Sequence, residues 1–181
     1  MINLNDVRDR IKELERAARL GCSAAMLTEH PLKHRRYDQS KYEPFWAAAR
    51  LTAHRHATSG KIRGVGDRTL RDVSSRATKA LYPALSVGDL NFSGVFERHP
   101  RLTLAMVEFG LAWAPHLLFT MDYTYHERHG EGIYRFKNGM LPSDFFSPQR
   151  RAKPPGGRHR HSPAGLGVYN VMWARTIRPA T

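Results

Sequence analysis

Short apolar runs alternate along the chain with segments whose apolar residues recur at helical spacing. Four short runs have the length and composition of buried strands: residues 22–28, 51–54, 101–108 and 167–173. Parallel strands covered by helices give this alternation, and their burial on both faces explains why the runs are almost continuously apolar. The pattern therefore predicts an α/β fold. Four strands cannot close an eight-stranded barrel, which leaves an open sheet or half of a barrel.

The first helical segment has a clear start and stop. Val7, Ile11 and Leu14 recur at helical spacing after Asn5 and Asp6, which are both candidate N-caps, and Gly21 follows the last periodic residue. Polar caps favour the first turn of a helix, and glycine is favoured just after its end. We therefore expect a helix that begins after Asp6 and ends before Gly21.

Further helices are expected along the middle of the chain. They are assigned to residues 45–50, to a stretch from residue 67 to the residue before Pro83, to a helix that carries Leu90, Val95 and Phe96, to residues 112–128, and to a helix start at residues 142–146. The end before Pro83 is expected because proline lacks the amide hydrogen that a helix interior uses. In residues 112–128, one face is expected to carry Trp113, Leu117, Met121 and Tyr125.

The composition fits a cytoplasmic domain. The 181 residues suit one domain, and 41% of them are hydrophobic, which is enough for a sizeable core. No apolar run is long enough to cross a membrane, and no signal segment opens the sequence. The single cysteine, Cys22, rules out an intrachain disulfide and fits a reducing compartment. We therefore expect a cytoplasmic location and no membrane partner.

The net charge of +13 raises the alternative of a basic nucleic-acid-binding module, but its distribution argues against one. Residues 147–181 hold seven of the 29 Lys and Arg and no Asp or Glu. Within them, residues 147–165 are rich in Arg, Pro and Gly without periodicity, as in irregular or disordered segments. We therefore divide the chain into a body over 1–146, an irregular segment over 147–165, and a last strand with its tail over 166–181.

Candidate chemistry lies where the expected strands end. His54 and His56 are two residues apart after the second run, and Glu108 closes the third. Parallel strands present their carboxyl ends at one edge, where ligands bind in open sheets and in barrels. A histidine and a carboxylate there suit a divalent metal and the activation of water. By themselves two such residues do not specify a site, and solvated histidines are the commoner outcome.

Longer stretches of the chain resemble the amidohydrolase-related family, which includes decarboxylases of the aminocarboxymuconate-semialdehyde type. The resemblance lies in YDQSKYEPFWAAA (37–49), in FSGVFERHPRLTLAMVEFGLAWAPHLLFTMDYTY (92–125), and in the later PSDFF and GVYNVMW. It implies a metal-dependent barrel that hydrolyses or decarboxylates small aromatic or carboxylated substrates with zinc or manganese. The implied fold is a partial (β/α)₈ TIM barrel with about strands 4 to 8.

The resemblance also assigns roles to single residues. His54 or His56 would be the metal ligand of strand 5, and Glu108 stands at the end of strand 6, where decarboxylase members have histidine. Thr176 stands where the family has the aspartate ligand of strand 8, and the motif of strand 1 is missing. Three protein ligands are usual for catalytic zinc. We therefore expect an incomplete copy with weak or no activity.

We infer a frame shift at the altered end of the resemblance. Loss of one base after the tryptophan codon of a W-G-S-D-Y-P motif yields the run WARTI, which is found at residues 173–177. Two alternatives stay open beside the inactive copy. The chain is half of an enzyme completed by another chain or by a homo-oligomer, or it is the basic nucleic-acid-binding module. A half barrel exposes sheet edges, so we also expect poor solubility or self-association.

Overall fold

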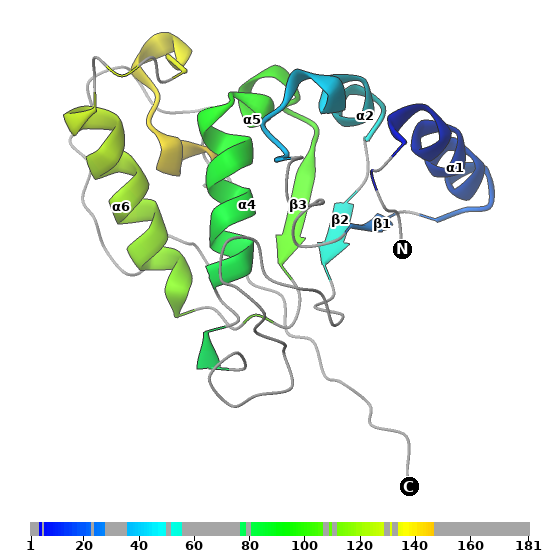
Figure 1. Ribbon diagram of the computed structural model, residues 1–181, viewed down its shortest axis with the longest axis horizontal. Helices are drawn as coiled ribbons and strands as arrows, with labels where there is room; N and C mark the ends of the chain where they lie inside the picture. Colours follow the sequence, from blue (N-terminus) through cyan, green and yellow to red (C-terminus); the bar gives the residue numbers. More distant parts are fainter. Residues whose placement is uncertain are drawn as a thin grey trace, which may run out of the picture.

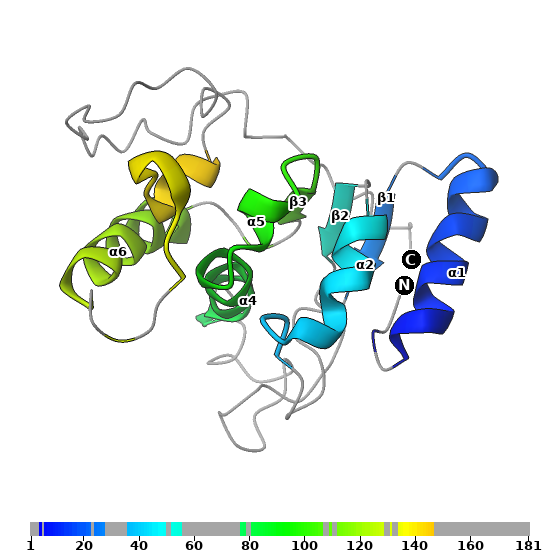
Figure 2. The ribbon, with the colours of Figure 1, turned by 90° about the horizontal axis from the view of Figure 1, so that it is seen from above.

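Helices and parallel strands alternate in the structure, a computed structural model (Figure 1). It describes residues 4, 6–22, 24–27, 36–49, 52–55, 77–78, 81–106, 109, 112–128, 131 and 134–146. The elements are α1 (Val7–Arg19), β1 (Ala24–Leu27), α2 (Glu43–Ala48), β2 (Thr52–Arg55), α4 (Leu81–Phe92), α5 (Val95–Arg98), β3 (Thr103–Met106) and α6 (Trp113–Glu127), with the short 3₁₀ helices η1 (Ser40–Tyr42), η2 (Lys137–Gly139) and η3 (Pro142–Phe146). From above, α1 and α6 lie at opposite ends of the molecule, with the strands and the helices α2, α5 and α4 between them (Figure 2).

The three strands form one parallel sheet in the order β1-β2-β3. Ala25 lies in register with Ala53 and Leu104, and one step further Met26 lies in register with His54. The strands expected over 22–28 and 101–108 are thereby confirmed in a shorter form, and the strand expected over 51–54 is confirmed with a shift of one residue. The fourth expected strand, over 167–173, lies outside the described residues. The α/β class is confirmed, and closure into part of a barrel stays a prediction.

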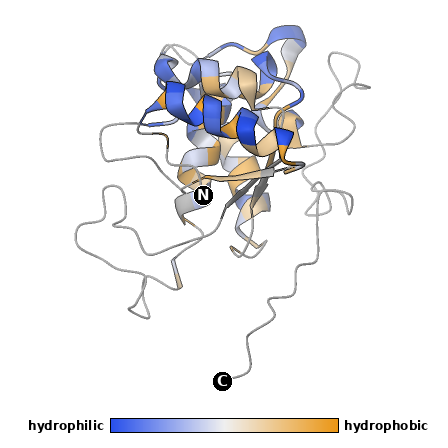
Figure 3. Cartoon of the chain, turned by 90° about the vertical axis from the view of Figure 1, so that its right-hand side faces the viewer, coloured by the Kyte–Doolittle hydropathy of each residue, from blue (hydrophilic) through white to orange (hydrophobic). Residues whose placement is uncertain are grey.

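Helix α1 begins and ends as its sequence pattern predicts. The Asp6 side chain accepts a hydrogen bond of 3.1 Å from the backbone nitrogen of Asp9, which satisfies one of the free amides of the first turn. Leu14 is buried, and Val7 and Ile11 pack against the same core. In Figure 3, where α1 faces the viewer, hydrophilic and hydrophobic residues alternate along this helix. The apolar stripe therefore holds α1 against the rest of the fold.

The hydrophobic core lies between one face of the sheet and the helices that cover it. Its buried members are Leu4, Leu14, Leu27, Tyr37, Tyr42, Phe45, Trp46, Ala49, Leu90, Val95, Phe96 and Leu102. The Trp46 ring packs edge-on against Tyr37 and Phe45, at centroid distances of 5.6 and 5.3 Å. Edge-on contacts of this kind add to the stabilisation that comes from burial of the rings. The aromatic residues that precede β2 therefore anchor α2 on the sheet.

Two boundaries differ from the sequence-based expectation. The helix expected from residue 67 lies almost wholly outside the described residues, and no helix ends before Pro83, because α4 begins at Leu81 and contains it. A proline is tolerated in the first turn, where the amide hydrogen has no partner within the helix. The single helix expected to carry Leu90, Val95 and Phe96 is divided into α4 and α5. Gly94 separates the two with a φ of 74°, a left-handed conformation that breaks the helix.

The segment that follows α6 is fixed by two buried side chains. Asn91 donates from Nδ2 to the carbonyl oxygen of Pro142, and Oδ1 of Asp122 accepts from the backbone nitrogen of Ser143, both at 2.9 Å. These two hydrogen bonds hold the carbonyl oxygen and the amide nitrogen of a single peptide group, the one that joins Pro142 to Ser143. They hold η3 against α4 and α6, and the helix start expected at 142–146 is confirmed as a 3₁₀ turn.

The predicted face of α6 is confirmed in part. Met121 is buried, and Trp113, Leu117 and Tyr125 are half-buried along the same helix. No helix among the described residues is both long and apolar enough to cross a membrane.

Candidate functional site

Of the predicted site residues, the structure describes only the backbone of His54. It lies on β2, the central strand, in register with Met26 on one side and Ala105 on the other. His56, Glu108 and Thr176 fall outside the described residues, so their predicted roles are untested. Among the residues that the structure does describe, no group of three or more His, Cys, Asp or Glu could hold a metal ion.

The register places position 54 on a defined face of the sheet. Leu27 belongs to the core cluster, and Ala25 and Leu104 pack against it, so these positions mark the face that the helices cover. Successive residues of a strand alternate between faces. Position 54, in register with Met26, therefore belongs to the opposite face. In a barrel, the face away from the helices is the interior, which leads to the catalytic end.

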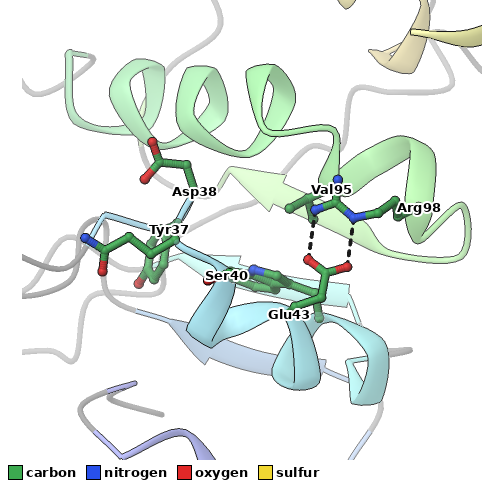
Figure 4. A pocket seen from close by; sticks show the side chains of 8 residues that line it. Tyr37, Asp38, Ser40, Glu43, Val95 and Arg98 are labelled. Carbon is green, nitrogen blue, oxygen red and sulfur yellow. Dashed lines mark hydrogen bonds and ion pairs between the residues drawn. The ribbon is translucent and has the colours of Figure 1, made fainter. Parts of the chain in front are cut away.

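A charged cluster that the sequence analysis did not identify lies between α2 and α5. Arg98 donates from Nε to Oε1 of Glu43 and from Nη2 to Oε2, each at 2.8 Å (Figure 4). Nε2 of His99 lies 2.8 Å from the same Oε1 and donates its hydrogen to it. Both carboxylate oxygens are therefore engaged, and the pairing with Arg98 is bidentate.

This pairing changes the acidity of the carboxyl group. The hydrogen bonds from Arg98, with a smaller contribution from His99, lower the pKa of Glu43 to about 2, although partial burial acts in the opposite direction. The same contact raises the pKa of Arg98. Glu43 is therefore a carboxylate at neutral pH whose lone pairs are occupied. It ties α2 to α5 and is poorly suited to act as a general base.

A second layer of contacts holds Arg98 in place. Its Nη1 donates to the carbonyl oxygen of Ser93 at 2.7 Å, and its guanidinium carbon lies 5.7 Å from the centre of the Tyr134 ring. The Tyr134 hydroxyl donates to Oε2 of Glu97 at 2.7 Å, and the backbone nitrogen of Lys137 donates to the other oxygen at 2.8 Å. The hydrogen bond to Glu97 raises the pKa of Tyr134.

A cavity of about 370 Å³ opens beside this cluster (Figure 4). It is lined by Tyr37, Asp38, Gln39, Ser40, Glu43, Trp46, Val95 and Arg98. Helices α2 and α5 lead into β2 and β3, and the arrows of both strands point away from these helices in Figure 1. The cavity therefore lies towards the amino ends of the strands. Barrel enzymes carry their chemistry at the carboxyl ends, so the cavity is not where the predicted site would be.

Little in the sequence pointed to this cluster. Glu43 and Arg98 are 55 residues apart, so no local spacing connects them. Both lie in the stretches that carry the family resemblance, but charged residues on short helices are usually solvated. Only the packing of α2 beside α5 brings them together.

Comparison with known proteins shows the fold. No protein-family model matches the chain, and no curated protein matches it. Among solved structures, 5-carboxyvanillate decarboxylase from Sphingomonas paucimobilis aligns with a TM-score of 0.63 at 23% identity, covering 78% of this chain and 43% of that one. An amidohydrolase from Mycobacterium avium subsp. paratuberculosis aligns with a TM-score of 0.60 at 15% identity, covering 80% and 39%. For 2,6-dihydroxybenzoate decarboxylase from Rhizobium the TM-score is 0.54 at 20% identity, covering 79% and 47%.

Of these similar structures, two are named as decarboxylases and one as an amidohydrolase. The likeness covers most of this chain, and the chain spans less than half the length of each of the three. The expected likeness to amidohydrolases and decarboxylases is confirmed for the fold, in which helices and strands alternate around a parallel sheet.

Proposed function

We propose that the chain is part of a metal-dependent amidohydrolase-type barrel of the decarboxylase group. The observation that carries the proposal is a parallel sheet whose central strand bears His54, in a fold similar to that of two aromatic-acid decarboxylases. The face of position 54, away from the helices, is the one a barrel turns inward. In this proposal the three strands are strands 4 to 6 of the barrel.

The proposed site takes zinc or manganese. His54 or His56 is the ligand from the central strand, because the two differ by two positions and share a face of an extended chain. Imidazole is a common ligand of zinc, so the donor chemistry of this histidine fits that metal. Three protein ligands plus water are usual for catalytic zinc, and Thr176 stands where the family resemblance places an aspartate ligand. We therefore propose that the 181 residues alone bind metal weakly.

The proposed substrates are small aromatic carboxylates. Two of the similar structures are decarboxylases named for 5-carboxyvanillate and 2,6-dihydroxybenzoate. In such a reaction the bond from the ring to the carboxyl group breaks, carbon dioxide leaves, and the ring carbon takes up a proton. A bound divalent metal would supply Lewis-acid polarisation of the substrate oxygens. Glu108, after the end of β3, is proposed to hold the proton that is exchanged with the ring carbon.

Metal affinity tests the proposed ligand directly. We expect the purified chain to bind zinc or manganese, and His54→Ala or His56→Ala to weaken binding by about tenfold or more, as loss of one ligand should. The histidine that is not the ligand should have a smaller effect. His126→Ala, on the exposed side of α6, is the control and should leave affinity unchanged. Equal metal affinity in all four proteins would refute the assignment.

Turnover is a separate measurement. Carbon dioxide release from 2,6-dihydroxybenzoate should be negligible for the chain alone, because the ligand set is incomplete. Turnover that requires metal and is lost in Glu108→Gln would support the carboxy-lyase activity but overturn the proposal that these 181 residues are inactive. Turnover that appears only on mixing with a polypeptide carrying the remaining strands would instead support a site completed by another chain.

A further inference from the structure

The cavity between α2 and α5 has the size and the walls of a small-molecule site. Its volume of about 370 Å³ lies within the range of such sites, roughly 300–1,000 Å³. Tyr37, Trp46 and Val95 line it and are almost completely buried, so much of its wall is apolar. The side chain of Ser40 lies on one side of it and those of Val95 and Arg98 on the other (Figure 4). A mostly apolar wall with a few polar groups is typical of sites that hold small organic molecules.

One polar atom of this wall has no hydrogen-bond partner. Trp46 is 2% exposed, and within the described part of the chain nothing accepts a hydrogen bond from its buried Nε1. Tyr37 and Phe45, which pack edge-on against the indole ring, hold that ring in place. An indole nitrogen can only donate a hydrogen bond, and a buried donor without a partner is costly. The partner that suits this nitrogen is therefore an acceptor atom, and the cavity is the space from which one can approach.

The charges around the cavity favour a neutral ligand. Asp38, Glu43 and Arg98 all line it. Arg98 is engaged by Glu43 in the bidentate pair, and Asp38 pairs with Arg36. The lining residues therefore offer no unpaired cation to hold an anion, and the two carboxylates would repel one. A cationic ligand is not favoured either, because each carboxylate already has a cationic partner.

We propose that this cavity binds a small phenol, at a site separate from the proposed metal site. A phenol is uncharged at neutral pH, its ring suits the wall of Trp46 and Tyr37, and its oxygen can accept the hydrogen of Nε1. The same hydroxyl group can donate to the hydroxyl oxygen of Ser40, an exposed residue of the wall. Because the cavity lies towards the amino ends of the strands, the inference does not depend on the metal-dependent activity proposed above.

Nuclear magnetic resonance of the ¹⁵N-labelled whole chain, with a metal chelator present, tests this site. Phenol is the probe, and the indole N–H signal of Trp46 is identified by its loss in Trp46→Phe. Phenol should move this signal in a saturable manner, with a roughly millimolar dissociation constant because the ligand is so small. Benzoate, a ring of similar size with a negative charge, should bind about tenfold more weakly or less, because the wall offers its charge no partner. Failure of the chain to bind zinc or manganese would leave this measurement unaffected.

Three variants separate the contributions, with binding followed through the line width of the phenol signals. Trp46→Phe keeps an aromatic ring but removes the donor, and should weaken phenol binding by about tenfold. Trp113→Phe makes the same change on α6, outside the cavity, and as the matched control should bind phenol as the wild type does. Ser40→Ala, at an exposed position, should weaken binding by about threefold through the loss of one hydrogen bond.

Several outcomes would overturn the proposal. A Trp46 signal that phenol does not move would show that water satisfies the indole nitrogen. Movement of another indole signal alone would place the phenol elsewhere, and equal binding of benzoate and phenol would refute the argument from charge. Circular dichroism and the melting temperature show whether Trp46→Phe is folded. If it is not, Ser40→Ala decides: a loss of about threefold supports the site, and an unchanged affinity refutes it.

Discussion

Gly94 is the position where a single methyl group should be most damaging. Its φ of 74° is left-handed, which costs any residue with a Cβ roughly 1–2 kcal/mol. A Cβ at this position would also lie 2.5 Å from Cε1 and Cε2 of Tyr134, far inside the ordinary contact distance. The ring cannot simply turn away, because its hydroxyl donates to Glu97 and its face covers Arg98. Overpacking of this kind costs roughly 1–3 kcal/mol, so Gly94→Ala should destabilise the fold by about 2–5 kcal/mol.

A double-mutant cycle separates the two contributions. The free energy of unfolding is measured in urea for Gly94→Ala in the wild type and in a Tyr134→Ala background. In the Tyr134→Ala background the change should cost only the backbone strain. The difference between the two costs, roughly 1–3 kcal/mol, is the coupling between the added methyl group and the ring. Gly139 also has a left-handed φ, of 66°, but a Cβ added there would have no atom within 4 Å. Gly139→Ala is therefore the matched control for backbone strain alone. If Gly94→Ala costs the same in both backgrounds, or no more than Gly139→Ala, the argument from overlap is wrong.

Two further predictions concern the contacts that join the helices. The pKa of Glu43 is lowered in the folded state from its ordinary 4.5 to about 2, so its contribution to stability is present above pH ~4.5 and is lost as the pH falls towards 2. As the pH falls through that window, the unfolding free energy should therefore fall less steeply for Glu43→Gln than for the wild type. Parallel curves of unfolding free energy against pH would contradict the lowered pKa of Glu43. Asn91→Ala should lower the free energy of unfolding in urea by about 2–4 kcal/mol, because it leaves the Pro142 carbonyl unpaired and opens a cavity at a fully buried site. A change below about 1 kcal/mol would show that water replaces the amide.

The sequence was informative wherever structure depends on neighbouring residues. The N-cap at Asp6 and the stripe of Val7, Ile11 and Leu14 predicted α1, because capping and helical spacing act within a few residues. The apolar runs predicted the three strands for the same reason, although the lengths of the first and the third were overestimated. The end placed at Pro83 was wrong, since proline is excluded from helix interiors but not from the first turn.

The candidate site was only partly predictable. The parallel sheet brings the chain at His54 between β1 and β3, as the strand pattern implied, and the roles of His56 and Glu108 stay predictions. The cluster of Glu43, Arg98 and His99 could not be read from the sequence. Its members are joined by the packing of two short helices, and a carboxylate 55 residues from its arginine has no signature in local spacing.

The strand order of the sheet has a consequence for how the chain folds. Because the order β1-β2-β3 equals the order along the chain, each strand pairs with the one that precedes it, and no strand has to insert between two others. During synthesis, β1 and α2 are available before β2 emerges, and β2 is available before β3. The sheet can therefore grow at one edge as the ribosome releases it. Further strands could be added at that edge without rearranging those already paired.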